Sequence, residues 1–110
     1  MALPNIKVNT FSSKQLLEIL EDENLPEESI EEKNKIVAKW LNTTKEHIEK
    51  IRNEKEDFTF QMAPKLARIR EKTPIMYVAY IGYIIAEREK NEIDKDMWYT
   101  LLQRNCSGGN

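Results

Sequence analysis

The sequence predicts an all-α fold, a compact single-domain bundle of five to seven short helices. Three observations predict it. Apolar residues recur at spacings of three and four, which places them on one face of a helix. Only 3 glycines and 4 prolines occur in 110 residues, so few tight turns interrupt this pattern. Hydrophobic residues make up 40% of the chain and charged residues 33%, which is typical of one globular domain with a single core.

The first two helices are predicted from the residues at their ends. Ser12 and Gln15 have the spacing of a capping box, in which each side chain binds the backbone N–H of the other residue. A helix is therefore expected from Ser12 to about Asn24. Asn24 and Pro26 mark a break in the chain. Because proline is tolerated in a first helical turn, the second helix is expected to begin there and to end at Asn42.

The middle of the chain is predicted to hold two further short helices. Thr43 and Glu46 have the spacing of a second capping box, so a helix is expected from there to about Lys55. Residues 58–62 alternate over too few positions for a strand. We expect them to form an extended loop with one of its two phenylalanines in the core. A short helix then covers residues 64–70.

The apolar helix from Pro74 to about Lys90 is the expected centre of the bundle, because a helix that is apolar on most sides is buried on several sides. Small residues on one of its faces let another helix approach closely: Ala79, Gly82 and Ala86. The last helix is expected to begin at Asp94. Its inward residues are predicted to be Met97, Trp98, Leu101 and Leu102.

Three regions are expected along the chain: an extended N-terminal arm at 1–11, a helical domain at 12–104 and a flexible tail at 105–110. The longest uncharged stretch, 73–86, is shorter than the roughly 20 residues that a membrane-spanning helix needs. The N-terminus has no apolar run of signal-peptide length. We therefore expect a cytoplasmic protein without membrane contact.

Residues 33–54 have the spacing of two helices joined by a tight turn. Ala38 lies where the helices would cross, and a larger side chain there would push them apart. Asn42 takes a turn position that often requires a left-handed backbone, which asparagine tolerates better than most residues. Ile48 and Ile51 on the second helix would face the first. This pattern resembles the generic helix-turn-helix of many DNA-binding proteins, without pointing to a specific family.

The resemblance implies a regulator that binds DNA, as a possible homodimer. In such motifs the second helix enters the major groove and its N-terminal residues meet base edges. DNA binding predicts one positive surface, formed by Lys45, Lys50 and Arg52 together with the basic cluster at 65–72. Glu46 and Glu49 argue against DNA binding, because their negative charges weaken the attraction of the helix to phosphates. The residues that the resemblance implies as DNA contacts are Thr44, Lys45, His47, Lys50, Arg52 and Asn53.

A second function is nearly as compatible with the sequence. The protein would then be an adaptor, inhibitor or accessory factor, of the kind found in phages or mobile elements, that binds a partner protein. Acidic residues crowd into 18–32, and tyrosines recur on the helix at 74–90. Aromatic residues are enriched at protein interfaces. The candidate partner-binding residues are Tyr77, Tyr80, Tyr83, Glu27, Glu28 and Glu31.

The sequence offers little for catalysis. It contains one histidine, His47, and one cysteine, Cys106, and the two do not have metal-ligand spacing. No glycine-rich phosphate loop and no motif of a nucleophilic enzyme is present. We therefore expect a non-enzymatic protein without catalytic residues, metal site or cofactor.

Overall fold

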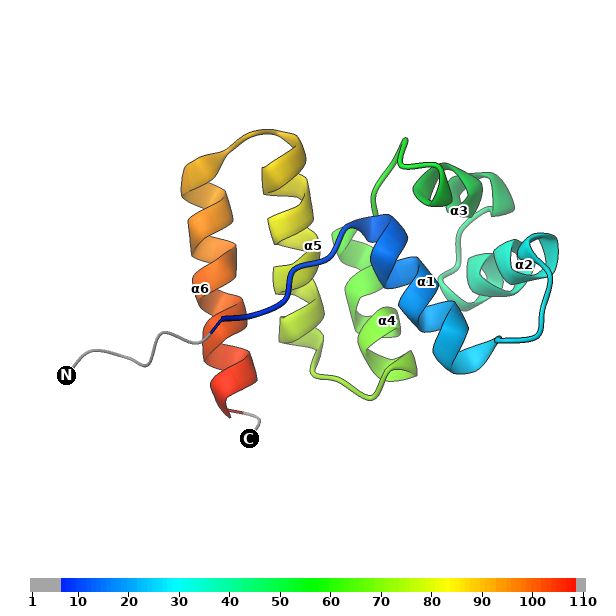
Figure 1. Cartoon of the computed structure of the whole chain (residues 1–110), viewed down its shortest axis with the longest axis horizontal. Helices are drawn as coiled ribbons and strands as arrows, with labels where there is room; N and C mark the ends of the chain where they lie inside the picture. Colours follow the sequence, from blue (N-terminus) through cyan, green and yellow to red (C-terminus); the bar gives the residue numbers. More distant parts are fainter. Residues whose placement is uncertain (1–6, 109–110) are drawn as a thin grey trace.

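The structure is a computed structural model that describes the backbone of residues 7–108 and the side chains of residues 7–105. This part of the chain forms six α-helices and one 3-10 turn, which confirms the all-α prediction. In Figure 1, α5 and α6 form an antiparallel pair at one end, α2 and α3 lie at the other, and α1 and α4 lie between them. The elements are α1 (Ser13–Asn24), α2 (Ile30–Trp40), α3 (Lys45–Arg52), η1 (Phe60–Met62), α4 (Ala63–Ile69), α5 (Pro74–Arg88) and α6 (Glu92–Gly108).

One hydrophobic core runs through the described residues, and every α-helix contributes to it. Phe58 is fully buried and Phe60 is exposed, so one of the two phenylalanines lies in the core, as predicted. Phe60 instead packs near the ring of Trp98. Fully buried side chains from the six helices include Leu17, Val37, Ile48, Leu66, Ile81 and Leu102.

The contact between α5 and α6 follows from small residues, as predicted. Ala79, Gly82 and Ala86 are all buried. The backbone of Gly82 lies directly against the Trp98 indole of α6. Because glycine carries no side chain, α6 comes close enough for this ring to cover the α5 backbone.

The first predicted capping box is present and several helix boundaries differ from the prediction. Ser12 Oγ accepts from the Gln15 N–H at 3.1 Å, and Gln15 Oε1 accepts from the Ser12 N–H at 2.9 Å. The second helix begins later than expected, at Ile30, because Ser29 is its N-cap residue and accepts from a backbone N–H in its first turn.

The last helix also differs from the prediction. α6 starts at Glu92 and continues to Gly108, so the expected tail is helical up to that residue, and 109–110 lie outside the described residues. Met97 is exposed rather than inward. Residues 7–11 have no regular secondary structure, in agreement with an extended arm, and the Val8 N–H donates to the Tyr99 hydroxyl at 3.1 Å. Residues 1–6 of the arm lie outside the described part.

Four helices are followed, two residues after their last helical residue, by a residue other than glycine with a positive φ. A left-handed backbone costs roughly 1–2 kcal/mol for residues with a side chain, and less for asparagine. Glycine is the usual residue at such positions. These residues are Asn42, Glu54, Glu71 and Lys90, with φ of 55°, 62°, 57° and 57°.

Replacing Glu71 by glycine should raise the free energy of unfolding by about 0.5–1 kcal/mol, because glycine adopts its φ of 57° without strain. Urea denaturation followed by circular dichroism measures the change. The matched control is Glu89→Gly, because Glu89 is also exposed at a helix end but has a φ of −82°. Glycine should destabilise the protein there, and a loss of stability in both variants would contradict the prediction.

Candidate nucleic-acid interface

The turn between α2 and α3 is set by Asn42. Its φ is 55°, and its N–H donates to the Lys39 carbonyl at 3.3 Å. The following N–H, of Thr43, donates to the Ala38 carbonyl at 2.9 Å. This pair of bonds is a Schellman ending, which satisfies the last carbonyls of α2 and reverses the chain within two residues. The predicted turn is therefore present, at the predicted residue.

The N-cap of α3 is Thr44, one residue later than predicted. Thr44 Oγ1 accepts from the His47 N–H at 3.1 Å. Thr43 lies before this N-cap, and its N–H completes the end of α2. The capping box proposed for Thr43 and Glu46 is therefore wrong.

The two helices cross at small and apolar residues. Ala38 is buried on α2, as the pattern predicted. Ile48 and Ile51 of α3 are completely buried and belong to the same core cluster as Val37 and Leu41. α3 packs against α1 and α2 at the end of the molecule away from α5 and α6 (Figure 1). The predicted helix-turn-helix pair is thus present, and α3 is not covered by the C-terminal helices.

Arg52 lies inward and fixes α3 to its two neighbours. Its guanidinium donates to the two carboxylate oxygens of Glu21 at 2.8 and 2.5 Å, and to Asn34 Oδ1 at 3.1 and 2.7 Å. The Arg52 side chain is 14% exposed and that of Glu21 is 2% exposed. The expectation that Arg52 contacts a DNA phosphate is therefore corrected, because its donors bind groups inside the protein.

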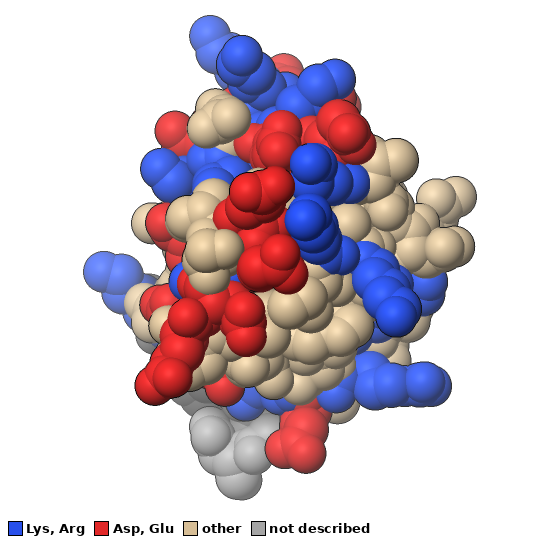
Figure 2. Space-filling view, turned by 90° about the vertical axis from the view of Figure 1, so that its right-hand side faces the viewer, with Lys and Arg blue, Asp and Glu red and all other residues tan. Residues whose placement is uncertain are grey.

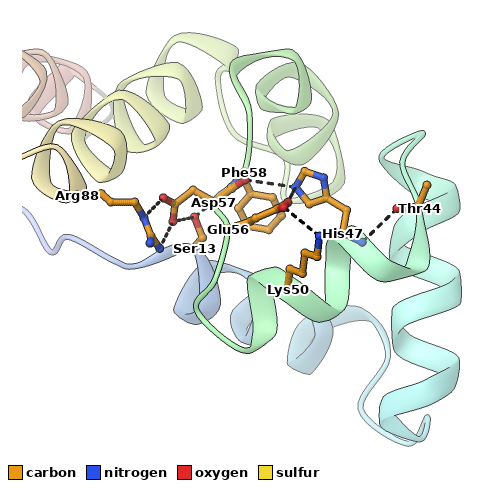
Figure 3. Close-up of polar contacts among 8 residues, drawn as sticks. All are labelled: Ser13, Thr44, His47, Lys50, Glu56, Asp57, Phe58 and Arg88. Atoms are coloured by element: carbon orange, nitrogen blue, oxygen red, sulfur yellow. Dashed lines mark hydrogen bonds and ion pairs between the residues drawn. The ribbon is translucent and has the colours of Figure 1, made fainter.

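A second polar cluster holds the segment that follows α3 (Figure 3). Asp57 accepts from Ser13 Oγ at 3.0 Å and from Arg88, and the Asp57 contact raises the pKa of Arg88. The Phe58 N–H donates to the same Ser13 Oγ at 3.1 Å. These bonds tie the segment to α1 and α5. The position of α3 is thus fixed on both of its sides.

His47 and Lys50 both reach toward this segment (Figure 3). His47 Nε2 lies 3.3 Å from the Asp57 carbonyl oxygen and 3.6 Å from a carboxylate oxygen of Glu56. Lys50 Nζ lies 3.5 Å from the other carboxylate oxygen of Glu56. The His47 side chain is mostly buried, whereas Lys50 is more than half exposed. Of these two candidates, Lys50 presents more of its side chain to solvent.

The outward side of α3, which we call the α3 outer face, carries acidic and basic side chains. All of the residues of this face are exposed except Lys45, which is half-buried. Glu46 and Asn53 lie roughly opposite the buried isoleucines, at about 100° of rotation per residue. The α3 outer face comprises Thr44, Lys45, Glu46, Glu49, Lys50 and Asn53.

The basic residues do not form the single positive surface that was expected. Figure 2 shows the end of the molecule that bears α2 and α3, where an acidic band crosses the middle and basic side chains lie at the top and along one flank. From the basic cluster at 65–72, Arg70 binds the Glu23 carboxylate at 2.8 and 3.0 Å. This bond lowers the pKa of Glu23 and raises that of Arg70. Non-specific attraction to DNA is therefore expected to be weak.

The proposed tyrosine face is not an exposed surface. Tyr77 and Tyr80 are buried, and Tyr83 is half-buried beside the ring of Tyr99. The Tyr77 hydroxyl accepts from Arg70 at 2.7 Å, and burial raises the pKa of this tyrosine. Tyr77 and Tyr80 are therefore corrected to core residues. The acidic candidates remain exposed: Glu27, Glu28 and Glu31.

The residues that position α3 were not identified from the sequence. Glu21, Asn34 and Ser13 are buried polar residues whose partners lie 18 to 45 residues away along the chain. The only signal for Glu21 and Ser13 was their place on the apolar side of a helix. Within the described residues, no group of His, Cys, Asp or Glu is arranged to hold a metal ion. None of the helices described here has the length and apolar character needed to cross a membrane.

Comparisons of the chain with protein-family models, with curated proteins and with solved structures find no match.

Proposed function

We propose that this protein is a DNA-binding regulator that reads base edges with the α3 outer face. The observation that carries the proposal is the α2–turn–α3 unit, in which α3 lies at one end of the molecule with its outer face exposed. This is the arrangement in which a helix can enter the major groove while the preceding helix crosses the backbone. The buried Arg52 ion pair supports the proposal, because a reading helix needs a fixed orientation.

The chemistry of the α3 outer face favours reading of bases over general attraction to phosphates. Lys45 and Lys50 can donate to guanine O6 and N7, and Asn53 can make a paired contact with adenine. The carboxylates of Glu46 and Glu49 can only accept hydrogen bonds, and the N4 amino group of cytosine donates one in the major groove. The same carboxylates repel the phosphates of any duplex, and only a site that offers a base donor to them offsets this repulsion. We therefore propose a reader with low affinity for random DNA and marked preference for its own site.

In vitro selection from a library of random duplexes tests this function directly. A DNA reader of this kind should enrich a short motif over successive rounds, at about 50 mM salt. The same motif reports the number of copies bound, because a palindrome with two half-sites indicates a symmetric dimer. A library that remains random after selection would refute the proposed function.

Replacing Glu46 by alanine should have two opposite effects. Preference at one base pair of the selected site should fall by on the order of tenfold, because a base-reading acceptor is lost. Affinity for random duplex should rise, because one negative charge is removed from the interface. Fluorescence anisotropy with the two duplexes measures both quantities. Glu87→Ala on α5 is the control, since it removes an equal charge outside α3 and should change neither. Equal behaviour of the two variants would argue against reading by Glu46.

A further inference from the structure

A polar cleft opens beside the start of α3. It has a volume of about 250 Å³ and lies between the α2–α3 turn and the segment that carries η1 and the first turn of α4. A single water needs only about 10–15 Å³ of such space, so the cleft is large enough for a phosphate group. Its lining residues are Leu41, Asn42, Thr43, His47, Thr59, Gln61, Met62 and Lys65.

The cleft is lined by hydrogen-bond donors and by no carboxylate. Four residues that border the cleft have side chains with hydrogen-bond donors: Thr43, Thr59, Gln61 and Lys65. Lys65 also borders a neighbouring hollow beside Arg68. No Asp or Glu is among the described residues that line the cleft. The unesterified oxygens of a phosphodiester only accept hydrogen bonds and carry negative charge. Its chemistry therefore matches the donors of the cleft.

The position of the cleft relates it to the α3 outer face. Thr43 immediately precedes the N-cap of α3, and His47 lies on its first turn, so the cleft adjoins the end of the helix that meets base edges. Contacts with phosphates fix the register and orientation of a protein on the duplex, whereas contacts with bases specify the sequence. A phosphate held in the cleft would set how far α3 enters the groove.

We propose that this cleft binds a phosphodiester of the DNA backbone, with Lys65 as the charged contact and Thr59 and Gln61 as neutral donors. The proposal rests on the proposed function, and it adds an anchoring site outside the recognition helix. It would add one placed cation to a surface on which acidic and basic side chains are interspersed. Lys65 is exposed and is not among the residues with an ion pair in the described structure.

Salt-dependent binding to a random duplex of about 30 base pairs tests the cleft without knowledge of the target sequence. Lys65→Met should lower the slope of log affinity against log salt by about 0.9, the value for one phosphate contact. The loss of affinity should be equal on selected and random duplexes. Thr59→Val, which removes a hydroxyl without changing charge, should weaken binding by about threefold to tenfold and leave the slope unchanged.

The matched control is Lys90→Met. It removes the same charge from an exposed lysine between α5 and α6, outside the basic cluster at 65–72. If Lys65 acts from the cleft, Lys90→Met leaves the slope at the wild-type value. Equal slopes for Lys65→Met and Lys90→Met would overturn the proposal while leaving DNA binding intact. Thermal melting by circular dichroism confirms that the variants are folded.

A titration with inorganic phosphate separates the cleft from the proposed function. In a nitrogen–proton correlation spectrum, the backbone amide signals of Thr43, Thr59 and Gln61 should move and saturate, and those signals should stay fixed in Lys65→Met. If the wild-type protein binds no duplex but these signals move, the proposed DNA-binding function is wrong and the cleft is a site for another anion. If the protein binds duplex and the signals do not move, the cleft proposal is wrong.

Discussion

Arg52→Met should lower the free energy of unfolding by about 3–5 kcal/mol, the largest effect that we expect from a single substitution. The reason is the Glu21 carboxylate, which is 2% exposed and would lose the one charged partner it has among the described residues. Removing one member of a buried ion pair leaves an uncompensated charge in a poorly solvated place, and costs of this size are usual. Asn34 Oδ1 would lose its two donors as well. Urea denaturation followed by tryptophan fluorescence measures the change.

Two further variants show whether the loss comes from the ion pair. Arg52→Lys keeps the charge but cannot donate to both Glu21 oxygens in parallel, so its loss should be smaller. The double variant Glu21→Leu/Arg52→Met should recover much of the stability, because no charge is left buried. If Arg52→Met costs less than about 1 kcal/mol, the pair does not fix α3 as we infer. In that case α3 would also need another constraint on its orientation.

Gly82→Ala should lower the free energy of unfolding by up to about 2 kcal/mol, the overpacking cost less the gain in helix propensity. A β-carbon at this position would overlap the Trp98 indole, and even the third-nearest ring atom, Cζ2, would lie only 2.8 Å away. Overpacking of a core by one carbon typically costs 1–3 kcal/mol. Alanine is a better helix former than glycine by about 1 kcal/mol, so a net loss must come from packing between α5 and α6. Thermal and urea denaturation both measure it.

Trp98→Leu tests whether the Trp98 ring causes the loss of stability in Gly82→Ala. It makes room beside residue 82, so Gly82→Ala should cost much less stability in that background than in the wild type. A double-mutant cycle then gives a coupling free energy between two residues in contact. Additive effects would mean that Trp98 is not what limits the side chain at position 82. α3 is not expected to be altered by either variant, because it packs on α1 and α2.

The local signals in the sequence predicted several features of the fold well, including the tight turn between α2 and α3. The Ser12 capping box, the left-handed Asn42 and the small Ala38 are each recognised within a few residues of the chain, and the structure has all three. Hydrophobic periodicity, which is also a local signal, predicted α5 as a buried helix with a face of small residues. A helix and its ends are determined largely by residues three and four positions apart.

Local signals failed where either of two neighbouring residues could take the same role. Thr43 and Thr44 are chemically equivalent caps, and only the backbone bond from Thr43 to Ala38 decides between them. Residues 105–108 looked like a tail because they are small and polar, yet they continue α6. Helix ends depend on a balance of small terms, so the boundaries moved by several residues while the helices themselves were found.

What the sequence alone determined about this protein is its set of helices and the tight turn between α2 and α3. Only the tertiary structure decided which polar residues face the interior. Arg52 and Tyr77 looked like surface contacts, but Glu21 and Arg70 bind them inside the molecule. Thr59, Gln61 and Lys65 meet Thr43 in one cleft only because the chain folds back beside α3. Periodicity defines the face of a helix, whereas burial depends on what a distant segment places against it.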